Sequence, residues 1–352
     1  MSSPARRVAL AIDALRHGWP IQIDRALALL PAETGFGPGV TAPQMLISAA
    51  RAATLKLANQ RAAAVPEAPV LIRSGARFDL AQARALADPA LDLRFPLKGP
   101  FLAEPLADRD AATAAMELAR LAGILPAFLV APTPAGEAQA VASSDLAAWK
   151  DTGQIVIASR ARLPVAATDD AEIVAFRAAD DHREHVALVI GVQTADRAPL
   201  VRLHSECLTG DILGSLKCDC GPQLHAALAA MAAEAATGGW GVLLYLRQEG
   251  RGIGLINKLR AYRLQDQGFD TVDANNRLGL PTEARDFPVA ARMLTLLGVG
   301  AIRLMTNNPA KVAALEAVGV TVAERVPHQL PPNPHNQRYL DTKRDRTGHL
   351  LG

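Results

Sequence analysis

The apolar residues in the second half of the chain form two alternating patterns. Short apolar runs of strand length lie at 154–166, 185–191, 198–205, 240–248, 301–306 and 320–326. Between most of these runs, apolar residues recur at helical spacing, in the segments 222–238, 252–268, 285–298 and 308–319. This alternation predicts a mixed α/β domain, followed by an irregular tail after Pro327.

Helical spacing dominates the start of the chain. Val8, Ile12 and Leu15 repeat at helical intervals, and Gly18 and Pro20 then end the pattern. Further predicted elements are a helix over Gln44–Gln60, a helix over 78–89, a short strand, a long helix over Asp110–Ala122 and a buried strand at Ala127–Val130. We therefore expect an α/β or α+β unit in which helices come first.

A change in composition separates the two halves. Residues 1–155 are rich in alanine and contain no cysteine, and a mixture of Pro, Ala and Ser at 133–149 marks a junction. We therefore predict two domains, at 1–155 and 156–352.

Composition and charge limit the classes of function. The 352 residues are 50% hydrophobic and 20% charged, which is typical of a globular protein. A net charge of only +2 indicates a small-molecule partner rather than a nucleic acid. Asp13 and Arg16 interrupt the first apolar stretch, and no apolar run approaches the roughly 18 residues of a membrane span. We expect a cytoplasmic protein with no signal peptide and no membrane contact.

All three cysteines lie close together in the sequence. Cys207, Cys218 and Cys220 cannot all pair in disulfides, and two of them are separated by a single residue. Thiolates are preferred zinc ligands, and three protein ligands with a fourth position left to water are typical of a catalytic zinc. The alternative is that the cysteines are small buried hydrophobic residues.

The first domain resembles part of a known family. Residues 88–127, DPALDLRFPLKGPFLAEPLADRDAATAAMELARLAGILPA, are similar to the later part of the dihydroxybutanone phosphate synthase domain of riboflavin biosynthesis. The family's early acidic run is missing, because only Asp24 and Glu33 are acidic there. Its Gly-His-Thr is replaced by residues 108–111, and its closing glutamate by 130–132. Without clustered carboxylates to hold a divalent cation, we interpret the domain as a catalytically inactive relic.

The second domain resembles GTP cyclohydrolase II from about residue 160 to the C-terminus. The similar blocks are HSECLTGDILGSLKCDCGPQL, YLRQEGRGIGLINKLRAYRLQDQG, DTVDANNRLG, RLMTNNPAKVAALEAVGV, ERVPHQ and YLDTKRDRTGHLL. The resemblance implies hydrolysis of GTP at C8 of the purine, with release of formate and pyrophosphate. It also implies 2,5-diamino-6-ribosylamino-pyrimidinone 5′-phosphate as the product, the first step of riboflavin biosynthesis, and a homodimer.

The same resemblance assigns roles to individual residues. It makes Cys207, Cys218 and Cys220 the ligands of one zinc ion, with water as the fourth ligand, and Mg²⁺ would accompany the GTP phosphates. The implied GTP-binding residues are Arg202, His204, Ser205, Glu206, Gln223, Glu249, Gly250, Arg251, Thr271, Thr306 and Lys311. The implied catalytic residues are Tyr262, Glu283, which stands where the family has aspartate, and Arg285.

Some of these residues also have ordinary structural explanations. Tyr262 has the spacing of a core aromatic residue, and Glu283 and Arg285 could be solvated residues before a helix capped by Asp286. Lys311 opposes the helix dipole in a first turn, which favours a phosphate partner. Three functional alternatives remain: a nucleotide-binding regulatory protein without turnover, a bifunctional enzyme, and a protein with a purely structural zinc.

Overall fold

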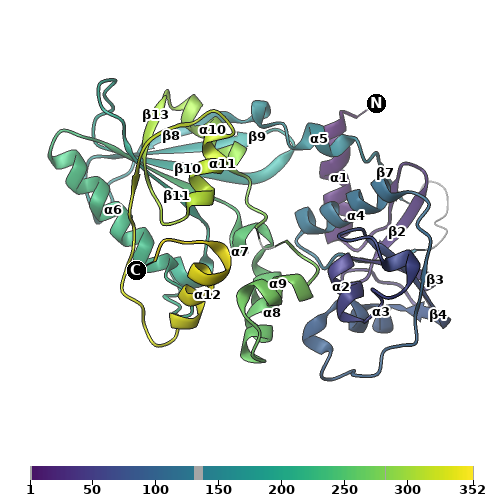
Figure 1. The fold of residues 1–352 in the computed structure, drawn as a ribbon. Coiled ribbons are helices and arrows are strands. Elements are labelled where there is room, and N and C mark those ends of the chain that lie inside the picture. The colour runs from purple at the N-terminus through teal and green to yellow at the C-terminus, as the bar shows by residue number, and fades with distance from the viewer. Residues whose placement is uncertain (1, 131–137, 282, 352) are drawn as a thin grey trace. The chain divides into compact units, whose positions relative to one another are not determined.

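The computed structural model describes residues 2–130, 138–281 and 283–351, and the chain forms two compact units (Figure 1). Unit 1 comprises Met1–Asp151 and Ile253–Glu283. Unit 2 comprises Thr152–Gly252 and Ala284–Gly352. The segment 253–283, which sequence analysis places in the second domain, thus packs with unit 1. Among the described residues, no helix combines the length and apolarity needed to cross a membrane.

Unit 1 is built on a sheet with the strand order β5-β4-β3-β6-β2-β1-β7. Its strands are β1 (Ile21–Ile23), β2 (Leu27–Pro31), β3 (Thr41–Ile47), β4 (Val70–Asp79), β5 (Leu102–Glu104), β6 (Ala127–Val130) and β7 (Gln139–Val141). Neighbouring strands are antiparallel except β1 and β7, which run parallel. The described part of this unit is therefore an α+β structure.

The helices of unit 1 are α1 (Pro4–Arg16), α2 (Ala49–Thr54), α3 (Leu80–Ala87), α4 (Arg109–Ala122), α5 (Asp145–Trp149), α8 (Leu255–Asp266) and α9 (Thr271–Arg277). Short 3-10 turns lie at Arg61–Ala63 and Pro89–Leu91. Helices α1 and α4 bury alanine and leucine side chains against Ile21, Leu29 and Phe128 of the sheet. Many of the side chains that these two helices bury are alanines.

Two predictions for unit 1 are wrong. Helices do not dominate its first part, because β1 and β2 follow α1 directly. Nor is Gln44–Gln60 one helix: its first residues complete β3, and α2 begins only after Ser48, whose side chain accepts a hydrogen bond from the backbone N–H of Arg51. The apolar run at 45–47 is buried in a strand with neighbours on both sides, and such a run lacks the alternation that marks a strand. The strand at Ala127–Val130 is confirmed.

Unit 2 contains a mixed sheet with the order β14-β13-β11-β12-β10-β9-β8. Its strands are β8 (Val156–Arg162), β9 (Ala171–Ala178), β10 (Asp181–Ile190), β11 (Leu200–Ser205), β12 (Gly241–Leu246), β13 (Ala301–Met305) and β14 (Thr321–Val326). The strands β11–β14 are mutually parallel, whereas β8, β9 and β10 are joined as antiparallel neighbours. The mixed α/β class predicted from the sequence is confirmed.

The helices of unit 2 cover both faces of this sheet. They are α6 (Cys220–Ala236), the short turn α7 (Glu249–Gly252), α10 (Phe287–Leu296), α11 (Pro309–Glu316) and α12 (Gln337–Thr347), with a 3-10 turn at Thr152–Gln154 and a π-helical turn at Leu208–Ile212. Met231 of α6 packs with Leu200 and Leu243, whereas Met293 of α10 packs with Val201 on the opposite face. Successive residues of β11 therefore point alternately toward α6 and toward α10.

The prediction of an irregular tail is wrong for part of its length. Helix α12 lies within the tail and ends at Gly348, which adopts the left-handed conformation of a C-cap. Leu340 is the buried anchor of this helix. Tyr339 and Leu340 are its only hydrophobic residues, and two adjacent positions give no helical period, so the pattern was not visible in the sequence.

Candidate active site

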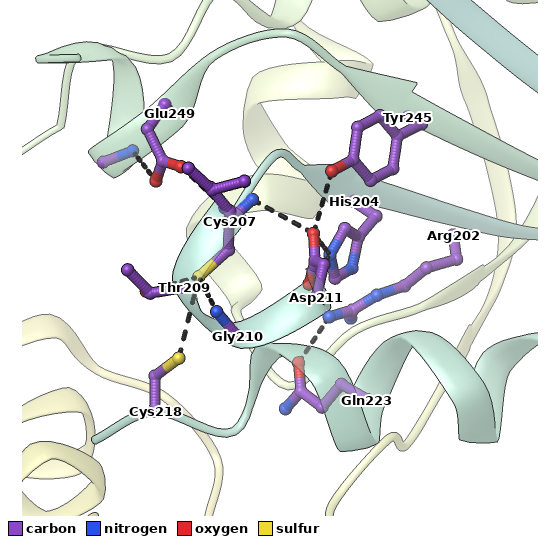
Figure 2. Close-up of polar contacts among 12 residues, drawn as sticks. Arg202, His204, Cys207, Thr209, Gly210, Asp211, Cys218, Gln223, Tyr245 and Glu249 are labelled. Atoms are coloured by element: carbon purple, nitrogen blue, oxygen red, sulfur yellow. Dashed lines mark hydrogen bonds and ion pairs between the residues drawn. The ribbon is translucent and has the colours of Figure 1, made fainter. Parts of the chain in front are cut away.

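Three thiols meet at the carboxyl end of the parallel strands. Cys207 follows β11, Cys218 lies in the turn before α6, and Cys220 is the first residue of that helix. Their Sγ atoms all lie within 4.8 Å of one another, and those of Cys207 and Cys218 are 3.7 Å apart (Figure 2). Three sulfurs bound tetrahedrally to zinc at about 2.3 Å would be about 3.8 Å apart, so the spacing matches that of a zinc site.

The backbone around the thiols leaves room for an ion. Gly210 donates its N–H to Cys207 Sγ at 3.3 Å, and a Cβ at this glycine would lie 3.0 Å from the sulfurs of both Cys207 and Cys218. The hydrogen-bond contact with Cys207, together with burial, raises the pKa of Cys218 to about 11. Crowded thiols of this kind need a cation to hold them as thiolates, so the donor set fits a metal ion.

Asp211 organises the wall of the site beside Cys207. Its side chain is 1% exposed and accepts hydrogen bonds from His204 Nε2 at 3.0 Å, Tyr245 Oη at 3.0 Å and Cys207 N at 3.0 Å. The rings of His204 and Tyr245 stack with centroids 5.6 Å apart, as expected of residues paired in register on β11 and β12. Burial, and then the Asp211 carboxylate, raises the pKa of Tyr245, so its hydroxyl remains a donor. Asp211 therefore fixes the position of His204 Nε2 and of the Cys207 backbone.

A second hydrogen-bond network connects Arg202 to the carboxylate of Asp219. Arg202 points toward α6, where its guanidinium donates to Gln223 Oε1, and Gln223 Nε2 donates to Asp219 at 2.7 Å. Lys343 of α12 donates to the other oxygen of Asp219 at 2.7 Å. Burial lowers the pKa of Arg202 to about 10. The C-terminal helix is thereby bonded to the residue that lies between Cys218 and Cys220.

Two buried donor or acceptor atoms at this site have no partner in the protein. Arg202 Nε and His204 Nδ1 have no hydrogen bond within the protein. Both residues are buried, at 8% and 3% exposure. Unsatisfied buried polar atoms are rare and costly, and they commonly mark a place that a ligand or water completes. Both residues point toward α6 from alternate positions of β11, so the structure brings two predicted GTP-binding residues together.

The loop after β12 contacts the residue after Cys207. Glu249 accepts hydrogen bonds from Leu208 N at 2.7 Å and from Gly250 N at 2.8 Å. Gly250 and Arg251 both have left-handed backbones, with φ of 63° and 61°. Glu206 accepts a hydrogen bond from Arg247 Nε at 3.0 Å, and Ser205 is half-buried at the end of β11. The predicted residues of this loop therefore line the same strand ends as the thiols.

Thr306 and Lys311 follow the next parallel strand, β13. Thr306 Oγ1 accepts a hydrogen bond from Asn308 N at 3.1 Å, and Asn308 caps α11 through Ala310 N. Lys311 is 6% exposed, and its Nζ donates to Leu203 O at 3.2 Å. Both side chains thus have protein partners, and their contact with phosphate stays a prediction.

The remaining predicted residues are divided between the units. Tyr262 lies on α8 of unit 1 with Lys258 Nζ 5.7 Å from its ring centroid, and Thr271 begins α9 and accepts from Gln265 Nε2 at 3.1 Å. Glu283 is exposed at the end of the unit 1 segment, whereas Arg285 belongs to unit 2, 5.6 Å from the ring centre of Phe287. The roles of these four residues stay predictions.

Sequence reasoning missed the residues that support the site. Asp211 and Asp219 lie within the cysteine block, and their position among the three cysteines was the signal that could have found them. Tyr245 and Lys343 carry no such signal, because only strand register and the packing of α12 bring them to the site.

Comparison with known proteins places this site in a family. The family model described as GTP cyclohydrolase II matches residues 156–327. The chain is 42% identical over 366 residues to GTP cyclohydrolase-2 of Azospirillum brasilense, an alignment that covers 98% of this chain and 94% of that protein. It is also 63% identical over 171 residues to GTP cyclohydrolase-2 of Azotobacter vinelandii, covering 48% of this chain and 80% of that protein.

Two further matches are narrower or more distant. Riboflavin biosynthesis protein RibBA of Bacillus cereus is 57% identical over 171 residues, which is 49% of this chain and 42% of that protein. A solved two-domain 3,4-dihydroxy-2-butanone 4-phosphate synthase from A. baumannii covers 91% of this chain and 99% of its own at 16% identity, but its TM-score of 0.29 is too low to indicate a shared fold. The near full-length match to the Azospirillum protein is decisive, and the chain belongs to the GTP cyclohydrolase II family of hydrolases.

Proposed function

We propose that the protein hydrolyses GTP at C8 of the purine and releases formate and pyrophosphate. The other product is 2,5-diamino-6-ribosylamino-pyrimidinone 5′-phosphate, and the reaction would open riboflavin biosynthesis. The observation that carries the proposal is the thiol cluster at the carboxyl ends of β11 and β12, with sulfur spacing suited to zinc, in a chain related over 98% of its length to GTP cyclohydrolase-2. Ligands commonly bind at this end of parallel strands.

Cys207, Cys218 and Cys220 would hold one zinc ion per chain and leave a fourth position to water. Bound zinc would supply a Lewis acid that lowers the pKa of water toward neutrality. Asp211 keeps Cys207 in place through the backbone N–H and holds a proton on His204 Nε2. In the neutral imidazole, His204 Nδ1 is then an acceptor, suited to a donor on the substrate.

The remaining groups would bind the nucleotide and move protons. Arg202 and His204 offer unpartnered atoms at the site, and Arg202 is held by Gln223. Arg251, Thr306 and Lys311 would contact the triphosphate, whose oxygens hold Mg²⁺ together with water. The other residues that would bind GTP are Ser205, Glu206, Glu249, Gly250 and Thr271.

Three residues would take part in the chemistry. Glu283 would accept a proton, and Tyr262 would donate to negative charge that develops in the ring. Arg285 would form a bond to the α-phosphorus as pyrophosphate leaves, and water would then cleave this bond to release the 5′-phosphate. Because glutamate is one methylene longer than the family's aspartate, Glu283 would need a different rotamer to reach the same proton.

Domain roles, assembly and location form part of the proposal. Residues 1–155 would have no synthase activity of their own, and 156–352 would be the cyclohydrolase domain. The proposed assembly is a cytoplasmic homodimer, which the mass of the protein in solution would test.

Product analysis tests the proposal. Zinc-loaded protein is incubated with GTP and Mg²⁺, and mass spectrometry and a formate assay identify what is released. Formate, pyrophosphate and the pyrimidinone in equal amounts are expected. Protein that binds GTP but releases no formate would contradict the proposal and favour a regulatory protein without turnover.

A further inference from the structure

The segment 253–283 leaves unit 2 and returns to it at a single tight junction. Ala284 N donates to Arg251 O at 3.1 Å, which joins the outgoing and returning chain. Gly252 lies there with φ of +89°, and a Cβ on it would come within 2.4 Å of Ala284 O. The family match at 156–327 runs through this segment, yet α8 and α9 pack with unit 1.

An ion pair holds α8 within unit 1. Arg260 donates to both oxygens of Glu33, at 2.9 Å and 3.1 Å, and its Nε lies 3.5 Å from Asp88. Glu33 also accepts a hydrogen bond from Leu125 N at 2.7 Å, so the backbone holds this carboxylate in addition to the arginine. Arg260 and Glu33 side chains are each 18% exposed, and a bidentate pair at this burial orders both side chains.

Close packing holds the rest of the segment. Asn257 is fully buried and donates from Nδ2 to Gly123 O at 3.1 Å. Gly279, which follows α9, has φ of +74°, and a Cβ at this position would lie 2.1 Å from Ser48 Oγ. Side chain, backbone and glycine contacts together seat both helices on unit 1.

Glu33 stands in the stretch where the synthase family places its early acidic residues. Only Asp24 and Glu33 are acidic there, and Asp24 accepts a hydrogen bond from the backbone N–H of Ser143. Among the described residues, neither carboxylate belongs to a group of three or more side chains that could hold a metal ion. Glu33, the more buried of the two, is instead the partner of Arg260 on α8.

We propose that unit 1 serves the cyclohydrolase reaction as the platform that positions α8, with Glu33 and Arg260 as positioning residues for Tyr262. Tyr262 lies two residues after Arg260 on the same helix, so the seating of α8 fixes the direction of the phenol relative to the rest of unit 1. This inference rests on the proposed function and gives unit 1 a role without any chemistry of its own. Small displacements of a reacting group are costly, about 100-fold for 1 Å.

The experiment compares Glu33→Gln with Glu117→Gln in the full-length, zinc-loaded protein. Glu117 pairs with Arg120 in unit 1 at similar exposure, 22% and 17%, but not with the segment 253–283, so it is a matched control. Glu33→Gln is expected to lower kcat for formate release about 10- to 100-fold, whereas Glu117→Gln leaves kcat unchanged. Arg260→Gln breaks the same pair from the other side and is expected to give the same loss.

A double-mutant cycle separates positioning from general destabilisation. In a Tyr262→Phe background, Glu33→Gln should lower kcat further by less than about twofold, because the group it positions is gone. An undiminished further loss, or equal losses for Glu33→Gln and Glu117→Gln, would overturn the inference. Active wild-type protein with an unaffected Glu33→Gln variant overturns only the inference, whereas wild-type protein that releases no formate overturns the proposed function as well.

Discussion

Both units of this protein pair buried charges, but they differ in whether buried polar atoms are left without a partner. In the described part of unit 1, buried charges are paired, as in Arg7 with Asp145 and Arg51 with Asp92. Among the described residues, the buried side-chain nitrogens and oxygens without a partner all lie in unit 2, at Thr194, Arg202, His204 and Arg292. Two of these four stand beside the thiol cluster. Paired charges order a fold, whereas unsatisfied ones at a strand end indicate a place for a ligand.

The largest expected effect comes from removing a thiolate in unit 2. Cys207→Ser should lower formate release by about 10³-fold or more and abolish zinc binding, because only the thiolates of Cys218 and Cys220 remain to hold the ion. The far-UV circular dichroism should not change. Zinc content, formate release and circular dichroism of the same preparation check this. Unfolding of the variant would instead favour a structural zinc.

Removing the proposed base should have the next largest effect. Glu283→Gln keeps the shape of the side chain but cannot accept a proton at neutral pH, so kcat should fall about 10²- to 10⁴-fold. Glu283→Asp restores the family's residue and should remain active. Full activity of Glu283→Gln in a formate assay would remove this residue from the chemistry.

A smaller loss is expected at Asp211. Asp211→Asn replaces one acceptor oxygen by a donor, so one of the bonds from His204, Tyr245 and Cys207 must break. Loss of such a supporting bond should weaken zinc affinity or kcat about 10- to 100-fold. Tyr245→Phe removes only the donor and should cost less. Zinc titration and initial rates of both variants test this order.

The pH dependence of stability should show a modest effect from unit 2. Burial, aided by the nearby Arg183, lowers the pKa of His185 to about 4, and its Nδ1 accepts a hydrogen bond from Arg247 N. The unfolded chain then binds more protons than the folded chain between about pH 4 and 6.5, so stability falls as pH drops through this window. His185→Gln should reduce this slope without abolishing it, because burial also lowers the pKa values of His328 and His349 to about 4. Urea unfolding at several pH values measures the slope.

The last prediction is that the full-length protein has no synthase activity. Ribulose 5-phosphate should give no dihydroxybutanone phosphate with the full-length protein, because the described residues of unit 1 contain no group of carboxylates that could hold a divalent cation. Detection of that product by mass spectrometry would show a bifunctional enzyme, and the contrast between the units would fail.

The sequence predicted the parts of the fold that have strong local patterns. The strand at 198–205, the helix at 222–238 and the long helix at 110–122 follow from apolar spacing and were confirmed. The three-stranded run β1, β2 and β3 was hidden, because these strands are short or buried on both faces.

The site was predictable only in part. Thiols two residues apart indicate a metal from chemistry alone, and the structure brings all three together. The bond from Lys343 to Asp219 depends on the packing of α12, and no local pattern records it. For the same reason the seating of α8 on unit 1 was not foreseen, since Arg260 and Glu33 are far apart in the sequence.

Formate release by metal-free protein during stepwise return of zinc tests the central claim most directly. The thiol cluster holds one ion, so the rate with saturating GTP and Mg²⁺ should rise from near zero and level off at one zinc per chain. Undiminished formate release before any zinc is added, or zinc bound at one per chain without formate release, would contradict the account.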